Sequence, residues 1–187
     1  FTLFISLPSQ KLDRYLLPLF PSLEIAAAVG IYRGSELLAK PRFRRYLFPL
    51  SCVFILAFQA AFSLPHHPYY LTYYNPLLGG PKKAPQVLLV GWGEGLDQAA
   101  RYLNQKEDAP QLKVATWYEQ VFRPYFQGET IPLEFYQPKG AHYVILYIND
   151  LQRRLHPAAI DEYYGQMEPE YVVRLKGVDY ALIYHTP

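Results

Sequence analysis

Residues 46–64 read Y-L-F-P-L-S-C-V-F-I-L-A-F-Q-A-A-F-S-L, and these 19 residues include no charged side chain. A helix needs about 20 mostly apolar residues to cross a bilayer, so the stretch predicts a transmembrane helix. It lacks the polar face that a surface helix of a globular protein presents to water. Pro49 lies near its start, where a missing N–H donor is tolerated. We therefore expect the chain to open with a membrane part.

A second apolar run precedes this stretch at residues 15–32 and predicts another span, in which Glu24 is the one charged residue. Residues 1–8 are apolar but lack the basic start and cleavage site of a signal peptide, so they are expected to be the tail of an earlier span. Residues 33–45 hold five Lys or Arg and one acid. Short basic loops stay in the cytoplasm, so everything after residue 64 is predicted to be extracytoplasmic.

The composition favours a membrane part followed by a soluble part. The formal net charge of +2 is too small to indicate nucleic-acid binding. Residues 1–64 carry seven Lys or Arg against three acids, whereas the rest of the chain is net negative, and such asymmetry is typical of a membrane-associated half. The single cysteine, Cys52, predicts no intrachain disulfide. The chain starts with Phe1, so it is expected to be the C-terminal part of a longer protein.

Residues 65–85 are interpreted as a linker rich in Tyr and Pro, and residues 86–187 predict a small α/β domain with a mixed sheet. The alternation of apolar residues predicts strands at 86–90, 112–116, 131–135 and 141–148, and helices at 96–105, 149–155 and 157–166. Residues 118–126 fit either type. Near the end, Lys176–Gly177 is flanked by two strand-like runs, 170–175 and 178–184, which predicts a terminal β-hairpin.

Gly91-Trp92-Gly93-Glu94-Gly95 lies between a predicted strand and a predicted helix, which is the position of a phosphate-binding loop. Its pattern is G-x-G-x-G rather than G-x-G-x-x-G, and Glu94 lies where a phosphate would bind. A tight turn is the favoured interpretation. The alternative is a nucleotide-binding domain, which would bind ATP or NAD.

Other candidates for chemistry are weaker. Two adjacent histidines, His66 and His67, could bind a metal, but zinc sites need three or four ligands. The spacing of the carboxylates singles out no pair for acid–base catalysis, and solvated surface carboxylates are the expected case. The carboxylates considered are Asp97, Asp108, Glu119, Asp150, Asp161 and Glu162.

Residues 11–21, K-L-D-R-Y-L-L-P-L-F-P, have the composition of a membrane–water boundary. The chemistry alone favours anchoring, in which Lys11 and Arg14 place their charges among lipid headgroups. The alternative is a phosphate clamp, with Arg14 as a bidentate fork, Lys11 as a point charge and Tyr15 as a hydroxyl donor.

This region also resembles a known family. Residues 4–23, F-I-S-L-P-S-Q-K-L-D-R-Y-L-L-P-L-F-P-S-L, are similar to the late membrane segment of bacterial polyprenyl-phosphate-dependent glycosyltransferases. These are the protein mannosyltransferase-like and aminoarabinose-transferase-like enzymes of glycosyltransferase family 39, in the GT-C class. Their recurring Lys, Tyr and L-P-x-x-P correspond to Lys11, Tyr15 and residues 17–21. Residues 68–104 are similar to the C-terminal part of a subgroup.

The resemblance implies an inverting transfer of a sugar from a polyprenyl-phosphate donor to a glycan, lipid or protein acceptor on the extracytoplasmic face. It implies that Lys11 and Tyr15 bind the donor phosphate with help from Arg14, although Asp13 departs from a purely basic cluster. The family's catalytic acidic residue lies in an early loop, so no catalytic residue is expected in this chain, which alone would be inactive. No cofactor is expected here, while the full-length enzyme could hold a divalent metal.

The expected fold is therefore the end of a polytopic α-helical membrane bundle, with two spans and the tail of a third, followed by an extracytoplasmic α/β domain. The expected partners are membrane lipids, the polyprenyl-phosphate donor and the acceptor, without nucleic acid. The alternative function is a membrane-anchored α/β binding module without catalysis.

Overall fold

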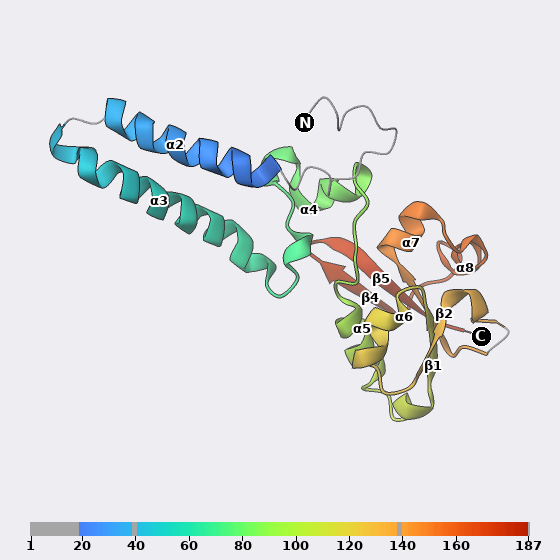
Figure 1. Cartoon of the computed structure of the whole chain (residues 1–187). Helices are drawn as coiled ribbons and strands as arrows, with labels where there is room; N and C mark the ends of the chain where they lie inside the picture. Colours follow the sequence, from blue (N-terminus) through green and yellow to red (C-terminus); the bar gives the residue numbers. More distant parts are fainter. Residues whose placement is uncertain (1–18, 39–40, 138–139, 187) are drawn as a thin grey trace. The chain divides into compact units, whose positions relative to one another are not determined.

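The computed structural model describes residues 19–38, 41–137 and 140–186 (Figure 1). The chain divides between Phe62 and Ser63 into two compact units. The described part of the N-terminal unit is helical, and the C-terminal unit contains a five-stranded sheet.

Two long helices, α2 (Phe20–Leu38) and α3 (Pro41–Ser63), form the described part of the N-terminal unit. They run side by side in Figure 1, and the rings of Tyr32 and Phe48 meet edge to face with their centroids 5.5 Å apart. Helix α3 begins at Pro41, and proline suits the first position of a helix because its missing N–H would have no partner there. Residues 33–38 form the end of α2, and residues 41–45 form the start of α3. Most of the segment that was predicted to be a basic loop is thus helical.

The prediction of a membrane bundle with two spans is wrong. Among the described residues, one helix is long and apolar enough to cross a membrane, and the stretch that qualifies is Tyr46–His66. Helix α2 differs because its 19 residues include Glu24, Arg33 and Glu36, and charged side chains are costly at membrane depth. Helix α2 therefore contains both the apolar residues of the predicted first span and charged residues that were expected in a separate loop. The predicted tail of a third span lies outside the described residues.

The C-terminal unit opens with a series of single helical turns, where the sequence predicted an irregular linker. These turns are η2 (Leu64–His66), η3 (Tyr70–Thr72), η4 (Pro76–Leu78), α4 (Gly80–Lys83) and η5 (Ala84–Gln86). Prolines at the first or second position of four of them fit this role, because a fixed φ suits the start of a turn.

The strand predicted at residues 86–90 is wrong, since these residues form turns and irregular backbone. The side chain of Gln152, and not another strand, bonds the backbone of this segment. Gln152 accepts from the N–H of Val90 at 2.9 Å and donates to the carbonyls of Pro85 and Leu88 at 2.7 and 2.9 Å. Because these bonds satisfy backbone groups that need partners, the segment is held without entering the sheet.

The five-stranded sheet has the order β2-β1-β3-β5-β4. Its strands are β1 (Lys113–Thr116), β2 (Glu129–Pro132), β3 (Tyr143–Tyr147), β4 (Tyr171–Leu175) and β5 (Val178–His185). The first three strands pair in parallel, and β5 pairs antiparallel with both β3 and β4. The predicted mixed sheet is thus confirmed. So is the terminal hairpin, whose turn residues Lys176 and Gly177 both have positive φ, as a two-residue turn requires.

Short helices cover both faces of the sheet. They are α5 (Leu96–Leu103), η6 (Ala109–Gln111), α6 (Glu119–Phe122), η7 (Arg123–Tyr125), η8 (Leu133–Phe135), α7 (Ile148–Arg153) and α8 (Pro157–Tyr163). Helices α5 and α6 share one buried cluster with alternate strand residues such as Ile145, while η8 and α8 share a second cluster with residues such as Leu146. This alternation follows from the two-residue period of a strand. The helices predicted near 96–105, 149–155 and 157–166 are confirmed.

Candidate functional site

The carboxyl ends of the parallel strands β1, β2 and β3 lie at one edge of the sheet. Strand β1 lies between β2 and β3 and runs parallel to both, so the chain moves to one side of β1 and then to the other. In open α/β sheets, ligands bind outside the carboxyl ends of strands where the order reverses in this way. Here that edge is followed by Trp117 and Tyr118 after β1 and by helix α7 after β3.

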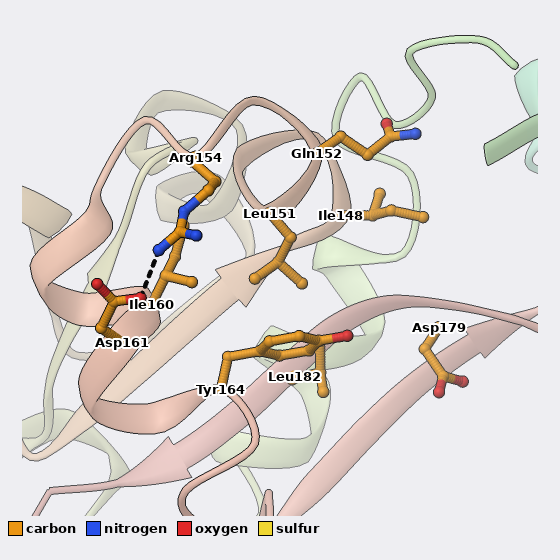
Figure 2. Close-up of a pocket in the computed structure, with 9 residues that line it drawn as sticks. All are labelled: Ile148, Leu151, Gln152, Arg154, Ile160, Asp161, Tyr164, Asp179 and Leu182. Carbon is orange, nitrogen blue, oxygen red and sulfur yellow. Dashed lines mark hydrogen bonds and ion pairs between the residues drawn. The ribbon is translucent and has the colours of Figure 1, made fainter. Parts of the chain in front are cut away.

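A pocket of about 460 Å³ opens beside α7, between this helix, α8 and the start of β5 (Figure 2). Its volume lies within the range of roughly 300–1,000 Å³ that is typical of small-molecule sites. The lining residues are Ile148, Leu151, Gln152, Arg154, Ile160, Asp161, Tyr164, Asp179 and Leu182. Two consecutive helices and a strand that begins 15 residues after them therefore meet around one concave surface.

The pocket has an apolar interior and one exposed aromatic ring. Ile148, Ile160 and Leu182 are buried, so their side chains close the inner surface. Tyr164 is 52% exposed, and Figure 2 shows its ring lying flat below Leu151 with the hydroxyl directed across the pocket. An exposed ring beside aliphatic side chains gives a flat surface on which an apolar face of a ligand can stack.

The charged groups that line the pocket, Arg154, Asp161 and Asp179, are all paired. Arg154 Nη2 donates to Asp161 Oδ1 at 2.6 Å, as the dashed line in Figure 2 marks. Asp179 is held by Arg174 through Nε at 2.5 Å and Nη2 at 3.1 Å. These groups still have unused N–H donors and carboxylate acceptors, since Arg carries five N–H groups. The rim can therefore offer hydrogen bonds of both kinds from groups whose charges are already paired.

A buried carboxylate ties the walls of the pocket together. Asp150 in α7 has a fully buried side chain, and its Oδ1 lies 3.0 Å from Nδ1 of His156, the residue before α8. Nε2 of His156 lies 3.2 Å from Oε1 of Glu134 in η8. The backbone N–H of Glu134 and, to a lesser degree, His156 lower the pKa of the Glu134 carboxyl, so it is ionised at neutral pH. This chain of contacts fixes α7 and α8 relative to each other.

Several buried acceptor atoms near the same edge lack a hydrogen-bond partner within the described part of the chain. They are Glu94 Oε1, Thr116 Oγ1, Asn149 Oδ1 and Asp150 Oδ2, with Thr130 Oγ1 further along β2. Buried polar atoms without partners are rare in native proteins, because each costs about 1–3 kcal/mol. Four of the five belong to the carboxyl edge or to the glycine-rich loop beside it. That edge therefore has unused hydrogen-bonding capacity that water or a ligand can take up.

The glycine-rich loop presents a carboxylate rather than a phosphate site. Glu94 Oε2 accepts from the backbone N–H of Trp92 at 2.6 Å and lies 3.1 Å from the hydroxyl of Tyr147. The N–H of Gly93 donates to the same hydroxyl at 3.0 Å. Burial and then the Glu94 charge raise the pKa of Tyr147, so its phenol stays neutral. Two N–H groups that could bind an anion are already engaged, which disfavours the nucleotide-binding alternative.

The predicted donor-binding residues Lys11, Arg14 and Tyr15 lie outside the described residues. Of the carboxylates considered, Asp161 lines the pocket and Asp150 joins its walls. Three others make contacts elsewhere: Asp97 with the hydroxyl of Tyr69 at 2.7 Å, Glu119 with Arg123 at 3.5 Å and Glu162 with the hydroxyl of Tyr136 at 2.6 Å. Sequence reasoning missed Tyr164 and Arg154, whose only sequence signal was their position near the ends of two short predicted helices.

Within residues 19–38, 41–137 and 140–186, no group of three or more His, Cys, Asp or Glu side chains is arranged to hold a metal ion. The two adjacent histidines bond hydroxyl groups instead. Nδ1 of His66 lies 3.1 Å from Oγ1 of Thr72, and Nδ1 of His67 lies 3.1 Å from the hydroxyl of Tyr70.

Comparison of the chain with protein-family models, with curated proteins and with solved structures gave no match.

Proposed function

We propose that this chain is the C-terminal part of a membrane glycosyltransferase that moves a sugar from a polyprenyl-phosphate carrier to an extracytoplasmic acceptor. We further propose that the pocket beside α7 holds a sugar residue of a glycan substrate. The transferase assignment is supported by the resemblance of residues 4–23 and 68–104 to the glycosyltransferase family described above. The pocket is the observation that supports a sugar as the ligand.

The chemistry of the pocket favours a neutral ligand with many hydroxyl groups. A sugar ring has an apolar C–H face that can stack on Tyr164 and hydroxyl groups that both donate and accept. Arg154 supplies donors, and Asp161 and Asp179 supply acceptors. A phosphate would be repelled by the two carboxylates, and a bare cation would meet Arg154. Because each charge is already paired while donors and acceptors remain available, the rim is suited to a sugar.

The membrane side of the proposal rests on helix α3. In the sequence, Lys40, Arg42, Arg44 and Arg45 precede its uncharged stretch Tyr46–His66, and no charged residue follows until Lys82. Positive residues next to a span favour the cytoplasm, so a single α3 span would direct the α/β unit to the extracytoplasmic side. The sugar-bearing end of a carrier lipid would then be on the same side as the pocket.

Tyr164→Ala is expected to weaken sugar binding about tenfold, because losing a stacking ring costs roughly 1.5 kcal/mol. Isothermal titration of the chain in lipid nanodiscs with a chitin trisaccharide and an α-linked mannotriose measures this effect. Tyr125→Ala is the matched control, since Tyr125 is a similarly exposed tyrosine outside the pocket. If neither sugar binds the unmodified chain, or if both variants bind equally, the pocket is not a sugar site.

The same variant separates the two candidate functions. In the full-length enzyme, Tyr164→Ala should raise KM for the acceptor glycan and leave KM for the lipid-linked donor unchanged. A full-length protein that binds sugar through the pocket but transfers none would instead support the membrane-anchored binding module.

Lys11→Ala in the full-length enzyme is expected to raise KM for the polyprenyl-phosphate donor about tenfold or more, since a charge-assisted contact to phosphate is worth roughly 1.5–3 kcal/mol. Steady-state transfer assays with varied donor measure the change. Lys11→Arg, which keeps the charge, should recover most of the affinity. Unchanged donor kinetics in Lys11→Ala would leave this residue with an anchoring role alone.

A further inference from the structure

The exposed apolar side chains of the C-terminal unit are concentrated near its start. Of the 14 large apolar side chains that are exposed among the described residues of this unit, nine lie within residues 64–92, which make up less than a quarter of it. They are Leu64, Tyr70, Leu71, Leu77, Leu78, Val87, Leu88, Leu89 and Trp92. Exposed apolar side chains scattered singly are normal, but such a concentration along one segment points to a binding partner.

The fold holds these side chains outward rather than leaving them to collapse. Asn75 caps the turn η4, accepting from the N–H of Leu77 at 2.9 Å, and Leu77 and Leu78 remain 92% and 80% exposed. The Gln152 amide secures the backbone on both sides of the consecutive exposed residues Val87, Leu88 and Leu89. A backbone bonded in this way cannot readily turn its side chains inward.

The charges and aromatic residues of this segment select the partner. Residues 64–93 contain two cations, Lys82 and Lys83, and no acidic residue. Both lysines are exposed. Basic residues beside apolar side chains favour an anionic lipid surface, and Tyr and Trp favour the headgroup region. The segment also continues directly from the apolar stretch of α3 that is long enough to span a bilayer.

We infer that residues 64–92 form a lipid-contacting surface, through which the α/β unit rests on a bilayer with anionic headgroups. Leu77, Leu78 and Val87 insert their side chains among the acyl chains, while Lys82 and Lys83 meet lipid phosphates. This inference rests on the membrane attachment in the proposed function, and it adds that the α/β unit is held at the bilayer surface.

Fluorescent labelling of single cysteines tests the inference directly. Because Cys52 is the only cysteine of the chain, a Cys52→Ser background allows an environment-sensitive NBD label at one site at a time. Labels are placed at Leu77→Cys, at Val87→Cys and, as a control, at the exposed Tyr125→Cys. The chain is studied in nanodiscs of phosphatidylglycerol and phosphatidylcholine, with and without bromine on the acyl chains.

Labels at positions 77 and 87 should emit at shorter wavelength and lose about half of their emission to brominated lipid, because inserted side chains reach the acyl boundary. The label at position 125 should show neither change. Lys82→Glu combined with Lys83→Glu should reduce the quenching at position 77 in anionic nanodiscs. Equal behaviour at 77 and 125 overturns the inference, and so does a blue shift at 77 without bromine quenching, which would indicate a protein partner.

A label in helix α3 makes this test independent of the proposed function. Phe58→Cys lies in the middle of the candidate span and should be strongly quenched by brominated lipid. If position 58 is not quenched, the membrane attachment itself fails. If position 58 is quenched and position 77 is not, only the lipid-contacting surface fails.

Discussion

Gly91→Ala is expected to destabilise the α/β unit by roughly 2–5 kcal/mol. Gly91 has a φ of +89°, a conformation that costs other residues about 1–2 kcal/mol. A Cβ at this position would also lie 2.6 Å from Cγ2 of Ile148 and 2.8 Å from Cε1 of Tyr147. Both neighbours are buried, so neither can move without disturbing the core or the pocket that Ile148 lines.

Urea unfolding followed by tryptophan fluorescence measures this loss, because both tryptophans, Trp92 and Trp117, lie in the α/β unit. The matched control is Gly165→Ala. Gly165 also has a positive φ, +78°, but nothing lies within 4 Å of a Cβ built there. Its cost should be the backbone strain alone, about 1–2 kcal/mol. Equal losses in the two variants would show that contact with Tyr147 and Ile148 contributes nothing.

Alkaline unfolding between about pH 10 and pH 12 is the second large expected effect. Burial, with the neighbouring Glu162 charge, raises the pKa of Tyr163 to about 12, and burial with Tyr164 nearby raises the pKa of Tyr184 to about 12. Below pH 10 both tyrosines are neutral in the folded and unfolded chain, so stability is intact. Above pH 10 they ionise first in the unfolded chain, so stability falls as pH rises toward the folded pKa.

Two pKa units correspond to roughly 3 kcal/mol for each tyrosine, and both side chains are almost fully buried. Their combined loss is comparable with the total stability of a small domain, about 5–15 kcal/mol. Circular dichroism at increasing pH should therefore show unfolding of the sheet in this range. Tyr163→Phe and Tyr184→Phe should each move the midpoint to higher pH, whereas Tyr125→Phe, at an exposed position, should not. No difference among the three variants would contradict the assignment.

Much of the α/β unit could be predicted from local patterns. Helix α5 buries Leu96, Ala99, Ala100 and Leu103, whose spacing of three or four residues is that of one helix face. Strand β3 and the terminal hairpin follow from apolar runs and from the turn at Lys176–Gly177. These predictions succeeded because the deciding interactions lie within a few residues along the chain.

Two predictions failed because a distant or adjoining segment decided the outcome. Residues 86–90 have the composition of a strand, but Gln152, more than 60 positions away, supplies their backbone partners. The predicted first span failed because the helix does not end where the apolar run ends and continues through Arg33 and Glu36. Composition marks where apolar residues are, but hydrogen bonding determines where an element begins and ends.

The sequence by itself determined the uncharged stretch of α3, the concentration of apolar and aromatic residues without acids after it, and the alternation that makes a mixed sheet. Each of these features depends only on which residues are neighbours in the sequence. Only the tertiary structure decided the pocket, since α7, α8 and β5 meet around it after folding. It also decided which carboxylates belong to the pocket and its walls. Asp161 and Asp150 have these roles because folding brings their partners, Arg154 and His156, within hydrogen-bonding distance.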